Sequence, residues 1–463
     1  MIQINRNIFP TARGAYIVGG SIRDLLLHQS PADYDLAIVD DPQKYAQQIA
    51  SNTAGRIIEI GKADQKILRV ISKNNIFDIS QINGSCIEED LRQRDFTINA
   101  MAYEISSGRI IDCSSGRQDL ADKKIRMVSN RIFKKDPIRL LRAYRMGASL
   151  NFSIETKTAA AIGRHAGLIR KSAGERIREE LYKMFQNTHS HYSICRMADT
   201  GLLFEIFPEL ADLKRRLRNR DQQLTAFEST LKAFGHLEGI LKNDPQLIPH
   251  IALRSFRDAN KTRAILLKCA MLLHDIGKPA GQTPDKEAAS QFYGHESKSA
   301  QMSLEICKRL RFSNRHKDYV HFIIHNQTRP ISLFRAYQNK TLTHAKITQF
   351  FVKYRNHTPD LLLQALALNW GKEVQTDDTH RAFLDFTLEM IRDYFTFFKP
   401  RESLPPLITG HDLIDEFGLR PSALFKSILN YVEEKRLTEK KMTRKDAIKL
   451  VKEFVKGEES GSE

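Results

Sequence analysis

Two acidic side chains, two residues apart, are the first groups in this chain whose types and spacing could do chemistry. Asp33 and Asp35 lead into the apolar run of residues 36–39, which is typical of a β-strand. Side chains at positions i and i+2 of a strand point to the same face, so both carboxylates can reach one divalent cation. An Asp-x-Asp sequence also occurs in solvated loops, so the pair alone does not define a metal site.

A glycine pair precedes these aspartates. Gly19 and Gly20 follow a β-like run and come before a short helical pattern. This order is typical of a phosphate-binding corner, because glycine lets the backbone approach a polyanion closely. Ser21 and Arg23 can donate further hydrogen bonds to phosphates. A Gly-Gly turn alone is common, but together with the two aspartates it indicates a site for a metal-bound nucleoside triphosphate.

The surrounding pattern predicts a small mixed β-sheet flanked by helices. Residues 42–54 have a helical pattern. Runs rich in β-forming residues follow at 56–60, 66–72 and 76–82. Asp78 lies in the last run, on a strand that we expect beside the Asp-x-Asp strand. It is a candidate third carboxylate, and a partly exposed strand aspartate without chemistry is the alternative.

A second dense cluster of polar side chains lies within residues 88–102. Arg92, Arg94, Asp95 and Asn99 are interleaved with apolar anchors at a helix-like spacing. Arginine can bind phosphates, and an aspartate or asparagine can bind a ribose hydroxyl. The cluster therefore suits the same nucleotide.

A basic helix is expected to begin near residue 136. Asp136 is a good helix N-cap and Pro137 a good first helical residue. Three arginines then recur at intervals of three and form one basic flank: Arg139, Arg142 and Arg145. Asp136 and Arg139 could also present hydrogen-bond acceptors and donors to the edge of a nucleotide base.

The composition favours a folded protein with a polyanionic partner. Lys plus Arg exceed Asp plus Glu by 17 in 463 residues. A merely basic surface is the alternative. Five scattered cysteines without paired spacing predict reduced thiols in a cytoplasmic protein and argue against a zinc cluster. The sequence shows no signal-peptide core and no long apolar run, so we expect neither secretion by that route nor a membrane span.

Together these motifs resemble those of the bacterial class II tRNA nucleotidyltransferases and poly(A) polymerases of the polymerase β superfamily. GGSIRD at 19–24 with DYDLAI at 33–38 is similar to the first family motif. QRDFTINAMA at 93–102 resembles RRDFTINAMA, with Gln93 in place of the first arginine. KDPIR at 135–139 is similar to the (E/D)DxxR motif, with Lys135 where an acidic residue is common.

The resemblance implies a role for each motif. Asp33 and Asp35 would hold two Mg²⁺ ions, so that the 3′-hydroxyl of RNA attacks the α-phosphate of a nucleotide. Asp136 and Arg139 would read the Watson–Crick edge of incoming CTP or ATP without a template. Asp78 would be a further catalytic carboxylate. The expected nucleotide-binding residues are Gly19, Gly20, Ser21, Arg23, Arg94, Asp95, Asn99, Asp136, Arg139, Arg142 and Arg145.

The second half of the chain is helical in pattern and resembles HD-type phosphohydrolases. Adjacent His and Asp residues with distant histidines can build a metal site that activates water. The possible ligands are His274, Asp275, His295 and His325. Ser229 and Asn369 stand where two further ligands would be expected. We therefore expect an HD fold that has lost its hydrolytic chemistry.

These observations predict an α+β protein with several parts. We expect a nucleotidyltransferase head at 1–128, a helical neck for base recognition at 129–213, a helical HD-like body at 221–400, an RNA-binding helical tail at 401–457, and disorder at 458–463. Within these parts, residues 175–185 are expected as a structural neck helix. Residues 435–456 are expected as one basic amphipathic helix with Ile448, Val451 and Phe454 on one side.

The predicted activity is template-independent addition of CMP to the 3′ end of tRNA, using CTP and Mg²⁺ and holding the acceptor stem. The passage between Asp78 and Arg92 is short. Relatives that add the full CCA usually have a longer flexible loop there, so the resemblance favours the CC-adding subgroup. Full CCA addition, A addition from ATP and poly(A) synthesis are alternatives with the same chemistry. An HD-type phosphohydrolase and a non-catalytic RNA-binding protein are alternatives of other classes.

Overall fold

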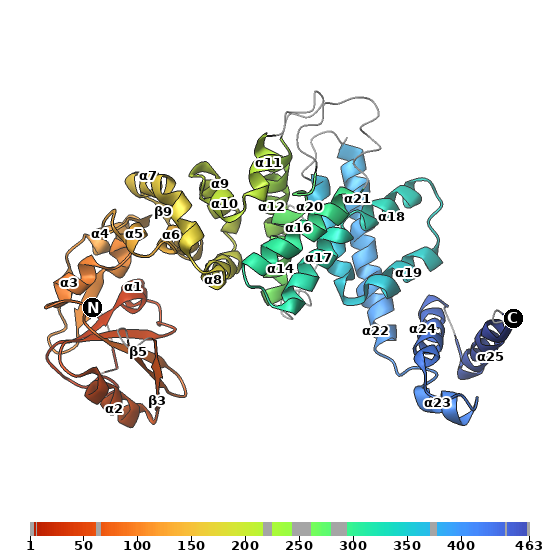
Figure 1. Ribbon diagram of the computed structural model, residues 1–463, viewed down its shortest axis with the longest axis horizontal. Coiled ribbons are helices and arrows are strands. Elements are labelled where there is room, and N and C mark those ends of the chain that lie inside the picture. Colours follow the sequence, from red (N-terminus) through yellow and green to blue (C-terminus); the bar gives the residue numbers. More distant parts are fainter. Residues whose placement is uncertain are drawn as a thin grey trace. The chain divides into compact units, whose positions relative to one another are not determined.

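A computed structural model describes residues 4–5, 7–61, 66–215, 225–242, 261–278, 294–370, 377–439 and 442–460 of the protein. The chain divides into two compact units, Met1–Pro208 with Arg309–Phe312, and Glu209–Lys308 with Ser313–Glu463. The strands of the described residues all belong to the first unit, and the second unit is built from helices (Figure 1). The predicted α+β class is confirmed.

The first unit begins with a seven-stranded mixed sheet. Its strands are β1 (Ala15–Val18), β2 (Tyr34–Ile38), β3 (Arg56–Ile60), β4 (Ile67–Ile71), β5 (Ile76–Gln81), β6 (Met101–Glu104) and β7 (Ile110–Asp112). They lie in the order β3-β4-β5-β2-β1-β6-β7, and β2 runs parallel to β5. The three predicted strands after residue 55 are confirmed, with ends shifted by at most one residue.

Alternating side chains give this sheet two different faces. Three helices flank it: α1 (Gly19–Leu26), α2 (Pro42–Thr53) and α3 (Ile87–Arg92). One face buries Leu36 and Phe77 in a core shared with α1 and α2. The other face buries Ala37 with residues of α3. Because successive strand residues point to opposite faces, Asp35 and Asp78 lie on this second face.

The remainder of the first unit is mostly helical. It contains α4 (Gly116–Ala121), β8 (Lys124–Ile125), α5 (Ile132–Lys135), α6 (Arg139–Leu150), β9 (Ser153–Ile154), α7 (Thr156–His165), α8 (Gly174–Phe185), α9 (Ser190–Asp199) and α10 (Leu202–Ile206). The predicted neck helix at 175–185 is confirmed as α8. Its apolar residues are buried as expected: Ile177, Leu181, Met184 and Phe185. Helix α8 packs against α6, which brings the polar flanks of the two helices together.

The basic helix begins later than the sequence predicted. Asp136 follows α5 in an extended conformation, whereas α6 begins at Arg139 with Ile138 as its N-cap. The side chain of Asp136 caps neither helix, so the predicted N-cap is wrong. The physical reason is that burial of Ile132 and Phe133 already fixes a helical turn before it. Asp136 therefore lies in the bend between two helices.

The second unit is an assembly of helices, as predicted. They include α11 (Glu209–Arg215), α12 (Ala226–Lys242), α14 (Lys261–Leu273), α16 (His295–Arg309), α17 (Asn314–His325), α18 (Arg329–Gln338), α19 (His344–Tyr354), α20 (Thr358–Trp370), α21 (Asp377–Asp393), α22 (Lys399–Glu402), α23 (Gly410–Asp415), α24 (Ala423–Thr438) and α25 (Arg444–Ser460). Three successive leucines of α20, residues 361–363, are fully buried. A helix that is apolar on all sides belongs in a core, and α20 packs against α12, α14 and α21.

The tail differs from its prediction in two places. Residues 435–456 do not form one helix, because α24 ends at Thr438 and α25 begins at Arg444. The two helices share a small apolar core that includes Val432 and Val451, so their pairing decides where the chain turns. Residues 458–460, which were expected to be disordered, belong to α25. Residues 461–463 lie outside the described residues.

Two predictions about the organisation of the chain remain predictions. The structure separates the chain into two units, and the finer division into head, neck, body and tail remains our proposal. A charged run at residues 214–220, which the sequence predicts to be a linker or an exposed helix flank, lies mostly outside the described residues. Among the residues that are described, no helix is both long and apolar enough to cross a membrane.

Candidate active site

The Asp-x-Asp segment is held in place by a buried hydroxyl. Strand β2 begins at Tyr34, so exposed Asp33 lies just before the strand and half-buried Asp35 lies inside it. The Ser21 Oγ donates to the carbonyl oxygen of Asp33 at 3.0 Å and accepts from the N–H of Asp35 at 2.7 Å. Ser21 is 2% exposed. Its hydroxyl thus fixes the backbone that carries both carboxylates, which differs from the predicted contact with a phosphate.

The glycine pair brings the start of α1 against the carboxylate of Asp35. Gly19 has a φ of +68°, and a Cβ there would lie 2.8 Å from Asp35 Oδ2 and 3.0 Å from Arg94 Nη1. No other residue type fits both the conformation and the space. The N–H of Gly20 donates to the carboxylate of Asp35. The first turn of a helix favours negative charge, so the same corner suits an added phosphate.

The carboxylates of this face repel one another when no cation is present. Asp35 and Asp78 are direct neighbours across β2 and β5. Burial raises the pKa of Asp35 to about 6; Arg94 opposes this shift, while the charges of Asp33 and Asp78 add to it. A bound cation would relieve that repulsion.

The third carboxylate has a partner of its own. Arg69 on β4 donates to both oxygens of Asp78, at 2.7 Å and 2.6 Å. Arg69 lies outside the motifs from which the site was predicted. A charged residue in the middle of the apolar run of β4 was the available signal, because such a residue needs a partner on a neighbouring strand.

The donor set fits a hard divalent cation that shares its ligands with a substrate. Asp33 and Asp35 provide carboxylate oxygens, which Mg²⁺ prefers together with water and phosphate oxygens. Within the part of the chain that is described, no group of three or more His, Cys, Asp or Glu side chains is arranged as a complete metal cage. Water or substrate oxygens would complete the coordination shell of an ion held by the two aspartates.

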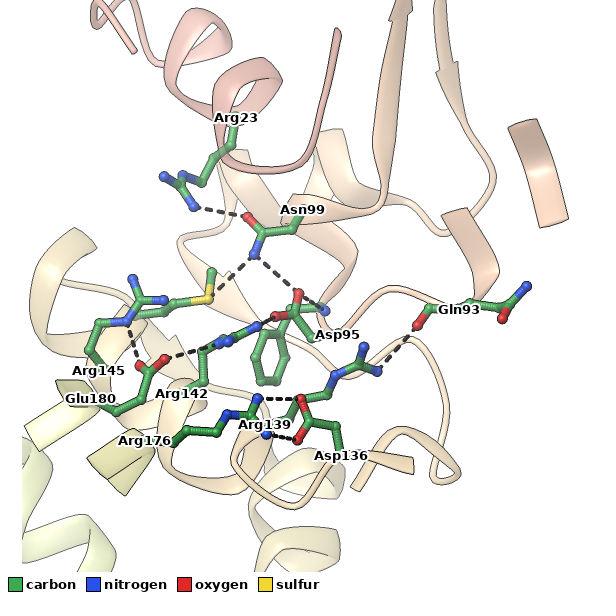
Figure 2. A network of polar contacts seen from close by, with 12 residues as sticks. Arg23, Gln93, Asp95, Asn99, Asp136, Arg139, Arg142, Arg145, Arg176 and Glu180 are labelled. Carbon is green, nitrogen blue, oxygen red and sulfur yellow. Dashed lines mark hydrogen bonds and ion pairs between the residues drawn. The ribbon is translucent and has the colours of Figure 1, made fainter. Parts of the chain in front are cut away.

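A polar network next to this site joins α1 and the segment at residues 95–99 to α6 and α8 (Figure 2). Asp95 accepts from the Nδ2 of Asn99 at 3.2 Å and from Arg142 at 3.2 Å. Asn99 Oδ1 in turn accepts from Arg23 at 2.9 Å. Burial by itself would raise the pKa of Asp95, but Arg142 and Asn99 outweigh it and hold the pKa below its usual value. The structure therefore brings together four of the residues predicted around the nucleotide: Arg23, Asp95, Asn99 and Arg142.

The anchor of this network is a glutamate that the sequence analysis missed. Glu180 of α8 is 7% exposed and accepts from Arg142 at 3.2 Å and from Arg145 at 2.9 Å. The signal was present in the sequence, since Glu180 lies between Ile177 and Met184 on the apolar stripe of α8. A charge on a buried stripe needs a counter-charge.

The bend before α6 carries a second set of contacts (Figure 2). Asp136 pairs with both terminal nitrogens of Arg176 at 2.9 Å, and Arg176 is another residue not predicted to take part. Arg139 donates to the carbonyl oxygen of Gln93 at 3.2 Å, and its buried Nε has no partner among the described residues. Burial lowers the pKa of Arg139. An arginine with a spare donor can still bind an incoming group.

The two departures from the family motifs are in direct contact. Lys135 Nζ donates to Gln93 Oε1 at 2.8 Å. Gln93 also bonds with Asn83, through its amide nitrogen to the carbonyl oxygen at 2.9 Å. Arg94, beside it, pairs with Asp90 of α3 at 2.9 Å and lies near Gly19. This segment therefore links β5, α3 and the bend before α6.

The HD-like residues of the second unit are only partly brought together. Asp275 lies 3.3 Å from His274 and 3.4 Å from His295, measured to their Nε2 atoms, and Lys278 also pairs with it. Burial favours a higher pKa for Asp275, but His274 and Lys278 outweigh it and hold the pKa well below its usual value. His325 contacts Ser297 at 3.4 Å instead.

Family models match three segments of the chain. Residues 15–126 match the poly A polymerase head domain, residues 151–214 match the probable RNA and SrmB-binding site of polymerase A, and residues 249–356 match the HD domain. Together these matches cover the sheet, the helices that follow it and part of the helical second unit.

Named relatives are similar over most of the chain. An A-adding tRNA nucleotidyltransferase from Deinococcus radiodurans is 28% identical over 92% of this chain and 92% of its own length. A CC-adding tRNA nucleotidyltransferase from Geobacter sulfurreducens is 32% identical, covering 58% of this chain and 61% of its own. Another from Thermus thermophilus is 26% identical over 89% of this chain and 87% of its own.

Solved structures share the fold. The Thermotoga maritima CCA-adding enzyme complexed with tRNA matches 95% of this chain and 91% of its own, with a TM-score of 0.61 at 20% identity. A complex of CCA-adding enzyme with CTP matches the same shares, with a TM-score of 0.63 at 18% identity. At these identities the likeness shows the fold alone.

We expect Asp35→Asn to stabilise the metal-free protein. A carboxyl whose folded pKa, about 6, lies above its unfolded value of 3.8 opposes folding at pH 8, and wild-type stability should rise as the pH falls from 6 to 4. The amide keeps an acceptor for Gly20 and removes the charge. Thermal melting in a chelator at pH 8 should show a gain of about 1–2 kcal/mol. Exposed Asp33→Asn is the matched control and should change little; a lower melting temperature for Asp35→Asn would contradict the assignment.

We expect Glu180→Gln to destabilise the protein by about 3 kcal/mol, because it leaves Arg142 and Arg145 beside a neutral group at a buried position. Urea unfolding of the first unit's transition measures the change. The neighbouring Glu179→Gln is the matched control, since the Glu179 side chain is 62% exposed. It should cost less than about 0.5 kcal/mol. Equal effects of the two substitutions would refute the anchoring role of Glu180.

Proposed function

Because this chain belongs to the bacterial tRNA nucleotidyltransferase and poly(A) polymerase family and is a nucleotidyltransferase, we propose that it adds CMP residues to the 3′ end of tRNA. It would use CTP, add the two C residues of the CCA end and need no template. The family is metal-dependent, and we propose Mg²⁺ as the ion. The scattered free cysteines of the described residues suit the reducing cytoplasm, where we place the enzyme.

The proposed reaction transfers a nucleotidyl group. The RNA 3′-oxygen forms a bond to the α-phosphorus of CTP, the bond to the β-phosphate oxygen breaks, and pyrophosphate leaves. When bound at Asp33 and Asp35, the metal would neutralise charge on the attacking and leaving oxygens. Asp78, next to Asp35 in the sheet, is the candidate to take up the hydroxyl proton. Gly19, Gly20 and the first turn of α1 would cradle the triphosphate.

The side chains of the adjoining network would hold the sugar and the base. Asp95 and Asn99 are already linked to one another and to Arg23, which suits a ribose hydroxyl beside the triphosphate. Asp136 and Arg139 would face the base, where the carboxylate would accept from the cytosine amino group and the guanidinium would donate to the carbonyl oxygen O2 and the ring nitrogen N3. The arginines around Glu180 would keep this surface positive.

The observation that carries CC addition is the short connection between β5 and α3. Only residues 82–86 separate these elements. The connection is bonded to α3, from the N–H of Asn83 to Asp90 at 3.0 Å and from the N–H of Ser85 to Glu89 at 2.8 Å. In relatives that add the full CCA, the family resemblance implies a longer flexible loop here, whose movement changes the shape of the base pocket so that it accepts ATP. Because this short connection is hydrogen-bonded to α3, it has little freedom to move. This supports a base pocket that stays in the form that selects cytosine.

A addition is the second candidate, and one observation favours it. The Deinococcus radiodurans relative, which is named as A-adding, matches 92% of this chain. An A-adding enzyme also needs only one form of its base pocket, so the short connection does not separate the two. A single-turnover assay that compares incorporation of CMP with incorporation of AMP distinguishes the two activities.

The HD-like second unit is proposed to support RNA binding without hydrolysis. Lys278 pairs with Asp275, and His274 and His295 lie 3.3 Å and 3.4 Å from it, so the carboxylate that a metal would need already has partners within the protein. Basic side chains of the paired tail helices α24 and α25 would contact tRNA phosphates by charge and shape.

We expect Asp136→Ala to relax discrimination between CTP, ATP and UTP and to lower the rate. A site built on hydrogen bonds rejects a wrong base by leaving polar groups unpaired, and the loss is about 10-fold or more in selectivity. Steady-state incorporation with each nucleotide measures it. Stability should fall by less than about 1 kcal/mol, since the pair with Arg176 is partly exposed. Exposed Asp199→Ala in α9 is the control; unchanged base choice in Asp136→Ala would remove Asp136 from the base site.

The decisive experiment is primer extension on tRNA that ends at the discriminator base, with Mg²⁺, CTP and ATP all present. We expect a product that ends in CC and is extended only when a second, A-adding enzyme is supplied. Asp33→Asn protein serves as the blank and should incorporate nothing. A product ending in CCA would refute CC addition, incorporation of A only onto tRNA ending in CC would establish the second candidate, and long A tracts would establish a poly(A) polymerase.

A further inference from the structure

One half of the sheet face that carries the carboxylates is open. Cross-strand pairs place Asp35, Asp78, Arg69 and Ile58 in one row across β2, β5, β4 and β3. Directly paired residues share a face, so the row runs from the carboxylates to the outer edge of the sheet. With strands about 4.8 Å apart, the row from Asp35 to Ile58 spans roughly 14 Å.

The outer part of this row is apolar and exposed. Ile58 and Ile60 of β3 are 39% and 38% exposed, and Ile71 of β4 is 40% exposed. Their cross-strand partners put all three on the carboxylate face. Helix α2 packs with β3, β4 and β5, but its buried residues join the core on the opposite face. We call the surface formed by Ile58, Ile60, Ile71, Arg56 and Arg69 the outer platform.

The platform lies on the far side of the carboxylates from the nucleotide residues. Gly19, Arg94 and the Asn99 network lie toward β1 and β6, whereas the platform lies beyond β5. In an in-line displacement, the attacking and leaving oxygens lie on opposite sides of the phosphorus. If pyrophosphate leaves from the corner at Gly19, the attacking 3′-hydroxyl must approach from the side of Asp78 and Arg69.

We propose that the outer platform binds the last nucleotides of the RNA strand whose 3′-hydroxyl attacks. The inference rests on the proposed function and adds the place where the acceptor strand lies. Isoleucine side chains offer an apolar contact to base faces, and Arg56 and Arg69 offer positive charge to the phosphates. At a spacing of 3.4 Å per nucleotide in a stacked strand, 14 Å holds about four nucleotides.

Arg69 ties the platform to the chemistry. Its guanidinium is fixed by both oxygens of Asp78, yet its side chain remains 36% exposed. A cation held there can contact the terminal phosphate of the RNA while it keeps the Asp78 carboxylate oriented. Arg56, which pairs with Ile71 across β3 and β4, is exposed at the edge of the same face.

The test compares RNA binding and nucleotide addition for variants of the platform. We use a stem-loop RNA with a single-stranded 3′ end, CTP and Mg²⁺. The double variant Ile58→Ser/Ile60→Ser should raise the KM for RNA about tenfold and leave the KM for CTP within about twofold of wild type. Arg56→Gln should weaken RNA binding and reduce the salt dependence by about one phosphate contact. Ile71→Ser provides an independent, smaller change if the double variant melts early.

Matched controls make each outcome decisive. Glu59→Gln changes a side chain that lies on the same strand, β3, but on its opposite face, where it is 56% exposed, and this variant should leave the KM for RNA nearly unchanged. If the wild-type enzyme is active and every platform variant has the same KM for RNA as the wild type, the inference is wrong. A platform variant that changes only self-association in sedimentation would also overturn it, because the surface would then be a protein contact. If the wild-type protein extends no RNA, the proposed function is wrong. The platform is then tested by itself, from the gel mobility shift of the RNA without CTP. Equal RNA affinity of the platform variants and the wild type would overturn the inference.

Discussion

The burial of one carboxylate against the start of a helix is the constraint on which the first unit depends. Asp35 lies between the first turn of α1 and the neighbouring aspartate of β5, where its charge is partly desolvated. That position requires a glycine at 19, whose missing Cβ leaves room for the carboxylate. It also requires a buried hydroxyl at 21 to fix the backbone on both sides. The carboxylate is thus held where its charge is unfavourable in the empty protein, and a bound cation would relieve that cost.

In the neighbouring network, arginine side chains of the protein stabilise the buried carboxylates. Asp95 and Glu180 are buried carboxylates, and each is paired with arginines of α6. In a low-dielectric region such pairs need good geometry and complete hydrogen bonding, which rigid helix packing provides. The arginines are consequently fixed in direction, and a chain with a net charge of +17 can present ordered donors beside the proposed nucleotide site.

Asp275 in the second unit is a third case of a buried carboxylate, after Asp35 and the pair Asp95 and Glu180. Lys278 pairs with it, and His274 and His295 lie within 3.4 Å of it, so the carboxylate has polar partners within the protein. The contrast with Asp35 is physical. At Asp275 the neighbouring side chains outweigh burial and the pKa falls; at Asp35 burial outweighs the effect of Arg94 and the pKa rises.

The sequence by itself determined the elements whose signal is local. Hydrophobic alternation located the strands around Asp35 and Asp78, the glycine pair located the turn into α1, and apolar spacing located α8, because each pattern repeats within a few residues. Tertiary structure alone decided which charges meet. Glu180, Arg176 and Arg69 gain their partners only when α8 packs on α6 and β4 pairs with β5. The bend at Asp136 was misread as a helix cap for the same reason: the burial of Ile132 and Phe133, which fixes the preceding turn, depends on contacts that lie far away in the sequence.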